Sequence, residues 1–572
     1  MSNTSRSLTI GIAGAGGDGV IIAGSFLQRL SALQGYYSQM PRYYGAQIRG
    51  GGSAVKLSLD ADAASFPGDS LDVLVCFDWE RYLEVKHELA LTPETIVLCE
   101  QDPEGQIELP RGSFVLDFSG ASRSVSGSTR GKNVVALAIL TRITGLRGDL
   151  VKKAIEEDEE LVLLKHNLPA FEAGEQLHSQ SSIPALHLPP PANASPRVIL
   201  SGNSATAQAA LRAGIKAFFG YPITPASEIM KEVYQDLIYD SGVFLQAEDE
   251  IAAAGLTIGA SVTGAKSLTA TSGPGFDLMT EMMGLATISE TPMVIVDVQR
   301  GGPSTGIPSG TEQSDLDHAI YGGHGDAPRT VLAPFDIEGC YRLTIESLNI
   351  AEGHQCVVIL LSDQWLAQTL VATSDTFLRD DPVIWDRKRP GPEDAADYLR
   401  YKLTDDFISP MANVGDEGFS YRTSGLSHDE KGRPAFDSGV NQSMHDKRWR
   451  KLAPLAERDE LVRLFGNESS SRGVIAWGST AQAVLETIRD LGLYDKVKLA
   501  VPELVFPLPH AVRRFVESTE KLLVVEMNHS GQFYHYLRSR VDLPKDTRLV
   551  ARAGSRPFSR QELGDPMLEL AA

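Results

Sequence analysis

Short apolar runs alternate along this chain of 572 residues with longer segments of helical periodicity. The clearest series lies between Val243 and Arg300. It contains apolar strands at 243–245, 266–270 and 292–298, a helix of small residues at 251–260, and a Met-rich helix before the last strand. Strands that alternate with helices are typical of βαβ units and a parallel sheet. The pattern therefore predicts an α/β fold here.

The same alternation recurs on both sides of this region, and 572 residues exceed what one hydrophobic core fills. Before it we expect strands at 8–13, 71–77, 95–99 and 197–200 and helices at 20–32, 133–140, 150–160 and 205–213. After it we expect strands at 356–361, 473–477, 497–501 and 521–526. The predicted organisation is an α/β domain at 1–185, a linker at 186–196, a second α/β domain at 197–371, an irregular insertion at 372–455 and a last α/β domain at 456–572.

Two of these boundaries depend on composition. The linker contains Leu188-Pro-Pro-Pro and Ser195-Pro, which favour a stiff extended chain. The insertion loses periodicity and is rich in Asp, Arg, Pro and Gly. So long a loop is either functional or partly disordered, and we expect it to cover a subunit interface.

Charge and cysteine usage exclude several classes of protein. A net charge of −21 and a pI near 5.1 disfavour nucleic acid as a partner. The four cysteines, Cys76, Cys99, Cys340 and Cys356, are far apart and lack the spacing of an iron–sulfur site. The first residues lack a signal-type apolar core, and no apolar run has membrane-spanning length. We expect a soluble cytoplasmic protein without a cluster of its own.

An acidic group, Glu248, Asp249 and Glu250, stands where the strand 243–245 passes into the next helix. A carboxylate there lies at the carboxyl edge of the sheet, where open α/β folds bind their ligands. The simpler alternative is an acidic helix start that complements the helix dipole. The spacing alone leaves both interpretations open.

Two glycine-rich loops lie near the start of the chain. The first, Gly14-Ala-Gly-Gly-Asp-Gly19, separates a strand from a helix as in dinucleotide-binding folds. It lacks the acid expected about 20 residues later for a ribose hydroxyl, so NAD is not expected. The second, at 40–52, carries Arg42 and Arg49. Both loops could hold an anion or could be tight connections.

Glu250, followed by a helix of Ala and Gly and by Thr271-Ser-Gly-Pro-Gly, resembles the pyrimidine-binding domain of thiamine diphosphate enzymes. The resemblance implies that Glu250 hydrogen-bonds the aminopyrimidine ring and favours the tautomer that takes the proton from the thiazolium carbon. Glu248 is the alternative for this role. The resemblance assigns further cofactor contacts to Tyr221, Pro222, Ile223, Ser272 and Gly273.

The run Tyr221-Pro-Ile-Thr-Pro resembles the Y-P-I-T-P motif of 2-oxoacid:ferredoxin oxidoreductases. In that family the threonine, here Thr224, contacts the substrate carboxylate, and an arginine at the place of Arg300 pairs with it. From the residues alone, Thr224 before a proline predicts a helix N-cap, and Arg300 is a charge at a sheet edge. The candidate pocket residues that remain are His324, Asp326, His428 and Asp429, although a lone histidine is more often structural.

The two glycine loops together resemble the gamma domain of the same family, which lies beside the route of coenzyme A. The resemblance implies CoA contacts at Gly14, Gly16, Gly17, Gly19 and Arg49. Thiamine diphosphate enzymes hold Mg²⁺ with Gly-Asp-Gly followed by Asn, and oxygen ligands suit that ion. Here Gly17-Asp-Gly19 is the sole such triplet, and no Asn follows before Asn133. We therefore expect no metal site in this chain and place the diphosphate, the Mg²⁺ and a [4Fe-4S] cluster in a beta subunit.

The resemblance identifies the chain as an alpha subunit with an N-terminally fused gamma domain, in an (alpha-beta)₂ heterotetramer. It predicts a multidomain α/β fold: a gamma-type domain, a pyrimidine-binding domain and a transketolase C-terminal-like domain. The implied reaction is oxidative decarboxylation of a 2-oxo acid with CoA, with electrons passed to ferredoxin. The domain order and the loop at 300–315 resemble the 2-oxoglutarate enzymes, which form succinyl-CoA.

Three alternatives stay open. Pyruvate or a branched-chain acid could be the substrate, because no group for a second carboxylate is evident in the sequence. A transketolase or dehydrogenase component is disfavoured by the gamma-like domain with Arg49. A non-catalytic nucleotide-binding scaffold would have no need of Thr224, Glu250 and Arg300 together.

Overall fold

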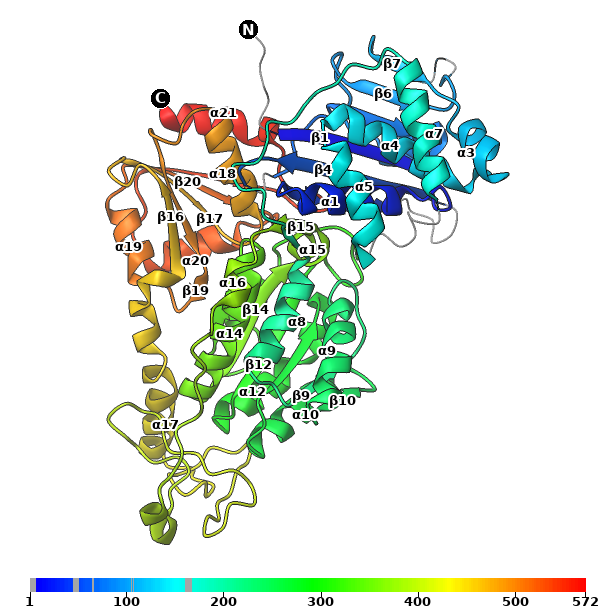
Figure 1. The fold of residues 1–572 in the computed structure, drawn as a ribbon. Helices are drawn as coiled ribbons and strands as arrows, with labels where there is room; N and C mark the ends of the chain where they lie inside the picture. The colour runs from blue at the N-terminus through cyan, green and yellow to red at the C-terminus, as the bar shows by residue number, and fades with distance from the viewer. Residues whose placement is uncertain (1–6, 45–50, 64–65, 104, 106, 160–166) are drawn as a thin grey trace. The chain divides into compact units, whose positions relative to one another are not determined.

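The computed structural model describes residues 7–44, 51–63, 66–103, 105, 107–159 and 167–572. The chain divides into two compact units (Figure 1). The first comprises Met1–Leu200 and Thr369–Arg379, and the second comprises Ser201–Gln368 and Asp380–Ala572. Each unit is an α/β assembly, as the alternation of strands and helices predicts.

The first unit contains a nine-stranded sheet in the order β7-β6-β5-β1-β4-β2-β15-β8, with β3 paired to β4. Its strands are β1 (Ser7–Ala15), β2 (Tyr37–Met40), β3 (Arg42–Tyr44), β4 (Gly52–Asp60), β5 (Val73–Cys76), β6 (Ile96–Cys99), β7 (Ser113–Val115), β8 (Val198–Leu200) and β15 (Leu370–Thr373). Its helices are α1 (Val20–Leu33), α2 (Trp79–Val85), α3 (Phe118–Ser126), α4 (Lys132–Thr144), α5 (Gly148–Glu157), α7 (Leu168–Gln180) and α16 (Thr376–Arg379). Helix α4 is buried along almost its whole length, as its apolar composition on all faces requires.

Most elements expected in this unit are confirmed, including α1, α4, α5 and the strands β1, β5 and β6. Strand β8 belongs to a different unit from the expected one. We expected 197–200 to open the second domain, but β8 pairs antiparallel with β15 in the sheet of the first unit. The second unit therefore begins at Ser201, after that strand.

The second unit is built on a seven-stranded sheet in the order β10-β9-β11-β12-β14-β13-β19. Its strands are β9 (Ala217–Gly220), β10 (Val243–Gln246), β11 (Ser267–Thr271), β12 (Met293–Gln299), β13 (Thr330–Leu332), β14 (Val357–Asp363) and β19 (Leu504–Phe506). Its helices are α8 (Gly202–Arg212), α9 (Ser227–Tyr239), α10 (Glu250–Val262), α11 (Gly273–Leu278), α12 (Thr280–Ile288), α13 (Leu316–Tyr321), α14 (Ile337–His354) and α15 (Gln364–Gln368). All pairs except β13 with β19 are parallel, so the carboxyl ends of β9, β10, β11 and β12 share one edge.

A five-stranded sheet in the order β16-β18-β17-β20-β21 completes this unit. It consists of β16 (Val462–Gly466), β17 (Arg472–Ala476), β18 (Lys498–Pro502), β20 (Lys521–Glu526) and β21 (Asp546–Ala551), with helices α18 (Thr480–Asp490), α19 (His510–Glu517), α20 (Gln532–Arg540) and α21 (Arg560–Ala571). Strand β19 lies between β18 and β20 in the sequence but belongs to the seven-stranded sheet, where it pairs with β13. Apolar residues of both sheets, such as Ile295 and Val524, belong to one buried cluster. The two sheets therefore hold their loops in a fixed relation.

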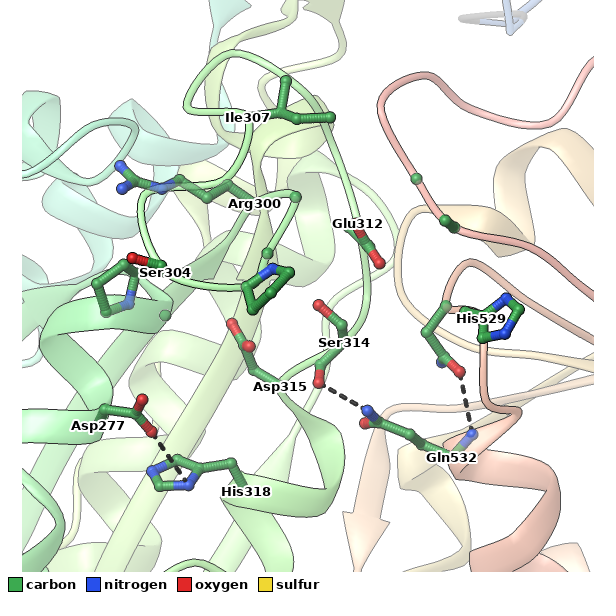
Figure 2. A pocket seen from close by; sticks show the side chains of 18 of the residues that line it. Asp277, Arg300, Ser304, Ile307, Glu312, Ser314, Asp315, His318, His529 and Gln532 are labelled. Atoms are coloured by element: carbon green, nitrogen blue, oxygen red, sulfur yellow. Dashed lines mark hydrogen bonds and ion pairs between the residues drawn. The ribbon is translucent and has the colours of Figure 1, made fainter.

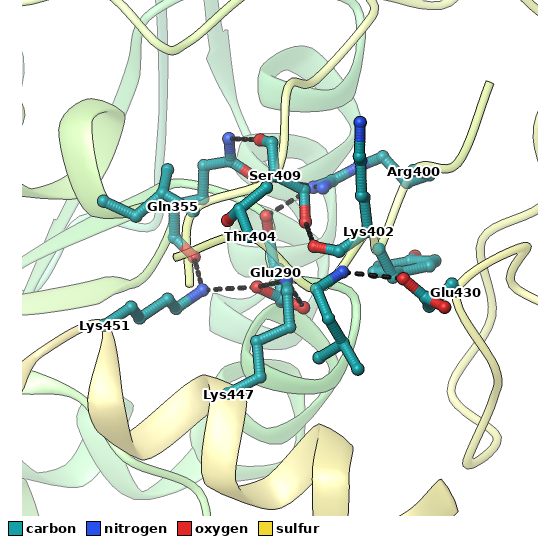
Figure 3. Close-up of polar contacts among 12 residues, drawn as sticks. Glu290, Gln355, Arg400, Lys402, Thr404, Ser409, Glu430, Lys447 and Lys451 are labelled. Atoms are coloured by element: carbon teal, nitrogen blue, oxygen red, sulfur yellow. Dashed lines mark hydrogen bonds and ion pairs between the residues drawn. The ribbon is translucent and has the colours of Figure 1, made fainter. Parts of the chain in front are cut away.

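The irregular insertion was expected at 372–455, but β15 and α16 at its start belong to the first unit. Between residues 380 and 455 the backbone is mostly irregular, and it includes an α-helix that periodicity did not predict, α17 (Ser438–Arg450). The inward side of α17 is formed by Met444, Lys447 and Arg448. Lys447 donates to both carboxylate oxygens of Glu290, at 2.5 and 2.6 Å, and Lys451 donates to one of them at 2.8 Å (Figure 3). A buried ionic cluster thus attaches this segment to the rest of the unit.

Over the described ranges of the chain, no helix has both the length and the apolar character that crossing a bilayer requires.

Candidate functional site

Glu250 occupies the first position of α10, directly after the strand β10. The helix cap is provided by its neighbour Asp249, whose side chain accepts a hydrogen bond from the backbone N–H of Ala252 at 2.8 Å. Glu250 itself is 5% exposed, and its carboxylate has no protein donor among the described residues. Because Asp249 already satisfies the helix start, the buried position of Glu250 calls for a different explanation.

The turn at 271–275 closes over the Glu250 carboxylate. A Cβ atom placed on Gly275 would lie 2.4 Å from Oε1 of Glu250 and 2.2 Å from Oγ1 of Thr271. Glycine is therefore required at 275, because any side chain would displace the acid. The carboxylate is held at the edge of the sheet, beside the ends of β10 and β11.

Arg300 follows the last residue of β12 and is 7% exposed. Its Nη1 donates to the backbone carbonyl of Thr224 at 2.5 Å, which joins the loop after β9 to the end of β12. Its Nε is buried and has no partner among the described residues. The structure thus brings Thr224 and Arg300 together, although 76 positions separate them in the sequence.

The expected helix cap at Thr224 is wrong. Helix α9 begins at Ser227, with Ala226 before it, and no side chain caps it. The Thr224–Pro225 peptide is cis, and the Thr224 carbonyl faces Arg300 rather than the helix. Thr224 is exposed on the same loop as Tyr221 and Pro222, and Ile223 is half-buried there.

An open pocket of about 950 Å³ lies in front of Arg300. Figure 2 shows Arg300, Asp315 and His318 on one side and His529 and Gln532 on the opposite side. The lining residues come from three parts of the second unit: Gly273, Pro274, Asp277 and Leu278; Arg300 to Ser304, Ile307, Glu312, Ser314, Asp315 and His318; and Asn528, His529, Ser530, Gln532, Ala553 and Gly554. Sequence reasoning missed the third part, for which the signal was a polar run directly after the strand at 521–526.

Hydrogen bonds from Gln313 fix the relation between the two sides of the pocket. Its Nε2 donates to the carbonyl of Trp477 at 2.7 Å, and its Oε1 accepts from Oγ1 of Thr480 at 2.6 Å. The side chain of Asn528 donates to the Gln313 carbonyl at 3.1 Å. The segment that carries Asp315 is therefore rigidly attached to the C-terminal sheet.

Burial shifts the ionisation of the groups in this pocket. Burial lowers the pKa of Arg300, against the opposing effect of the Asp315 carboxylate. Burial also raises the pKa of Asp315 to about 6. His318, whose Nδ1 lies 3.5 Å from Oδ1 of Asp277, has its pKa lowered by burial. A permanent cation beside a weakened acid is suited to bind a carboxylate anion.

The other candidate residues lie in different places. Ser272 is buried with an unpartnered Oγ, and Gly273 lines the pocket. His324 and Asp326 are exposed in the loop after α13. His428 is buried, with its ring centroid 4.0 Å from that of Tyr401, and its Nδ1 is 2.8 Å from the Leu426 carbonyl. None of these last three lines the Arg300 pocket.

In the first unit the two glycine loops meet, since the N–H of Gly16 donates to the carbonyl of Gly51 at 3.2 Å. Asp18 accepts from the backbone N–H of Ala15 at 2.8 Å and pairs with Lys132 at 2.8 Å. Gly14, Gly17 and Gly19 belong to the same loop. Lys132 was not predicted, and its signal is a lone cation at the start of an apolar helix. Arg49 lies outside the described residues.

No group of three or more His, Cys, Asp or Glu side chains is placed to hold a metal ion in the part of the chain that the structure describes. The residues around Glu250 do fit the pyrimidine half of thiamine diphosphate. They offer a buried carboxylate without a protein donor, and the turn that packs against it carries the unpartnered Ser272 hydroxyl. These are the groups that an aminopyrimidine ring would pair with.

Two family models match the chain. The model "Pyruvate flavodoxin/ferredoxin oxidoreductase, thiamine diP-bdg" matches residues 208–446, and "Pyruvate ferredoxin/flavodoxin oxidoreductase" matches residues 9–177. The 2-oxoacid:ferredoxin oxidoreductase subunit alpha of Saccharolobus solfataricus is 30% identical over 612 aligned positions, which cover 96% of each chain. The 2-oxoglutarate synthase subunit KorA of Methanothermobacter marburgensis is 37% identical over 59% of this chain and 90% of its own length.

The likeness to solved structures includes one that extends along the whole chain. It is a 2-oxoglutarate:ferredoxin oxidoreductase from Magnetococcus marinus with 2-oxoglutarate, coenzyme A and succinyl-CoA bound. The match has a TM-score of 0.91 and 34% identity, and it covers 99% of this chain and 100% of that one. The chain belongs to the 2-oxoacid:ferredoxin oxidoreductase family. It is an alpha subunit with a fused gamma-like domain, and the expected multidomain α/β fold class is confirmed, with a thiamine diphosphate-binding domain after the gamma-like one.

Proposed function

We propose that this chain is the alpha subunit of a 2-oxoglutarate:ferredoxin oxidoreductase. The enzyme converts 2-oxoglutarate and CoA into succinyl-CoA and CO₂ and passes the electrons to ferredoxin. The observation that carries the proposal is the direct hydrogen bond between Arg300 and Thr224 at the same sheet edge as the buried Glu250. The likeness to the Magnetococcus marinus enzyme and to KorA supports 2-oxoglutarate as the substrate.

The Arg300 side chain is suited to hold the carboxylate next to the oxo group. Its Nη1 is engaged by Thr224, while the edge formed by Nε and Nη2 has no protein partner among the described residues. A guanidinium edge of this kind binds a carboxylate through two parallel hydrogen bonds. For the second carboxylate of 2-oxoglutarate, the remaining basic side chains of the lining are His318 and His529.

We further propose that Glu250, Ser272, Gly273 and the loop at 221–223 hold the pyrimidine half of thiamine diphosphate. When bound, this cofactor supplies the nucleophilic carbon and the electron sink that decarboxylation requires. The buried Glu250 carboxylate, against which the 271–275 turn packs, would exchange a proton with a pyrimidine nitrogen of the bound cofactor. Arg300 and Thr224 meanwhile orient the oxo acid.

The remaining parts of the catalyst belong, in this proposal, to a beta subunit. It carries the diphosphate site, the Mg²⁺ and a [4Fe-4S] cluster in a cytoplasmic (alpha-beta)₂ heterotetramer that reduces ferredoxin. Support comes from the sequence, in which Gly17-Asp-Gly19 is not followed by the Asn of the Mg²⁺ motif. CoA would contact the loop at 14–19 and Arg49, which the gamma-like family match supports.

The proposal is tested with the chain co-expressed with a cluster-bearing beta subunit. We expect a brown complex that reduces a viologen dye with 2-oxoglutarate and CoA at a kcat/KM at least tenfold above that with pyruvate or 2-oxoisovalerate. Higher activity with pyruvate would overturn the substrate assignment. A colourless chain that forms no complex would instead favour a nucleotide-binding scaffold.

Arg300→Ala is expected to raise KM for the oxo acid about 10- to 100-fold, the range for losing a charge-assisted hydrogen bond. KM for CoA should change little, because Arg300 is proposed to contact the oxo acid alone. Arg300→Lys is the matched control, since it keeps the charge without the paired donors. Its KM for the oxo acid should lie between that of the wild type and that of Arg300→Ala. An unchanged KM in Arg300→Ala would remove Arg300 from substrate binding.

A further inference from the structure

Two carboxyl groups meet behind Arg300 without a cationic partner. Asp297 lies in β12, two residues before Gln299, and its side chain is fully buried. No N–H or hydroxyl donor among the described residues reaches either of its carboxylate oxygens, or Oδ2 of Asp315. The polar group in contact with Asp297 is the carboxyl group of Asp315.

The charged groups around this pair do not neutralise it. Asp277 on α11 acts on both carboxyl groups, and Glu312 acts on Asp315, and both are acids. His318 pairs with Asp277. Arg300 acts on Asp315 at a distance but forms no ion pair with it among the described contacts, because its Nη1 is directed to the Thr224 carbonyl.

Two carboxylates in contact inside a protein cannot both ionise, because burial and mutual repulsion penalise the second charge. A single proton shared between them forms one hydrogen bond between the two carboxyl groups and removes one of the two buried charges. Burial, and then the neighbouring Asp315 carboxyl, raise the pKa of Asp297 well above its ordinary range. Asp297 is therefore the group that keeps its proton, and Asp315 is the group that titrates.

The surrounding structure prevents Asp315 from moving away. Its backbone N–H donates to Oε1 of Gln299 at 3.1 Å, and Nε2 of Gln299 donates to the Ser362 carbonyl at 3.2 Å. Its Oδ2 lies 3.1 Å from the position that a Cβ on Gly273 would take. The carboxyl group thus stays between Arg300 and the 271–275 turn.

We propose that Asp297 and Asp315 share one proton and form a positioning pair that sets how strongly Arg300 attracts the substrate carboxylate. The inference rests on the proposed function of Arg300. With Asp315 neutral, the guanidinium charge is fully available to the substrate. With Asp315 ionised, its negative charge partly neutralises Arg300 and repels the incoming anion.

The sign of the pH dependence follows directly. Burial raises the pKa of Asp315 to about 6, so its negative charge appears as the pH rises through this value. In the assembled complex we expect KM for 2-oxoglutarate to increase about three- to tenfold between pH 5.5 and pH 7.5. KM for CoA should not follow this curve.

Asp315→Asn tests the pair, because it removes the titrating charge and keeps the shape. The variant should have a low KM for the oxo acid that is flat across this pH range. Asp326→Asn is the control, since it removes an exposed acid that does not line this pocket and should keep the pH dependence. A wild-type pH dependence of KM in Asp315→Asn would overturn the proposal.

A second measurement does not depend on activity. The infrared spectrum of the complex at pH 7 should contain the carbonyl band of a protonated buried carboxyl group, and the band should be lost in Asp297→Asn. This variant should still fold and keep the pH dependence, because its amide can donate to Asp315 as the acid does. No difference in the carbonyl region would overturn the shared proton. If 2-oxoglutarate is not a substrate, this band still decides whether the proton is shared, so the two failures are distinguishable.

Discussion

Replacing Glu250 with Gln is expected to lower kcat by about 10²- to 10⁴-fold, the range for loss of a general acid–base group. The amide keeps the shape of the side chain but cannot exchange a proton with a pyrimidine nitrogen. Subunit assembly should be unchanged, because the cap of α10 is made by Asp249 and not by Glu250. The measurement is the steady-state rate of dye reduction by the purified complex at saturating substrate.

Glu248→Gln is the matched control for this variant. Glu248 lies two positions earlier and is exposed, so the same chemical change there should leave kcat within about twofold. Full activity of Glu250→Gln would remove Glu250 from the mechanism. A large loss in Glu248→Gln with little loss in Glu250→Gln would transfer the role to Glu248, the alternative that the sequence left open.

Apolar periodicity predicted most strands and helices, because the strands form buried sheets and the helices pack an apolar face against them. It failed at α17, whose inward face is formed largely by Lys447 and Arg448. Such a helix has the pattern of a solvated segment, and its burial becomes understandable only with Glu290, which lies 157 positions earlier. The start of the second unit was also predicted wrongly. The strand at 197–200 belongs to the first unit because it pairs with β15, which lies far along the chain.

The candidate site was predictable where a motif carries it. Glu250, Thr224 and Arg300 stand at the ends of strands, and parallel pairing gathers such ends at one edge. Asp297 had a signal that was not used, a single acid inside the apolar strand at 292–298. Its partner Asp315 ends the loop at 300–315, and the wall around His529 follows the strand at 521–526. Neither position shows that the two line one pocket, because tertiary packing between distant segments brings them together.

Glu290→Ala is expected to lower the free energy of unfolding of the second unit by about 3–5 kcal/mol, the cost of removing one partner from a buried ion pair. Glu290 and Lys447 are fully buried, and Lys451 is 3% exposed. Arg400 donates to the Glu290 carbonyl at 2.7 Å, so the same residue also holds the irregular part of the segment (Figure 3). Without the carboxylate, two lysines remain buried with no counter-charge.

The loss of stability should first appear as local unfolding of the 380–455 segment, because the ionic cluster around Glu290 attaches this segment to the rest of the unit. Limited proteolysis of the complex should therefore cut within 380–455 much faster in Glu290→Ala, and the melting temperature should fall. Lys388→Ala is the matched control in the same segment. It breaks the exposed pair with Asp406 at 2.9 Å and should cost at most about 1 kcal/mol.

The pH dependence of stability is a second, independent test of the role of Glu290. Burial alone would raise the pKa of Glu290, but Lys447, Lys451 and Arg400 outweigh it and hold the pKa well below its ordinary range. A carboxyl group with a depressed pKa in the folded state adds stability above its unfolded pKa, near ~4.3, and loses that contribution as the pH falls further. The difference in stability between wild type and Glu290→Ala should therefore be largest near neutral pH and shrink below about pH 4. Equal stability of the two proteins at pH 7 would show that the cluster does not hold the segment.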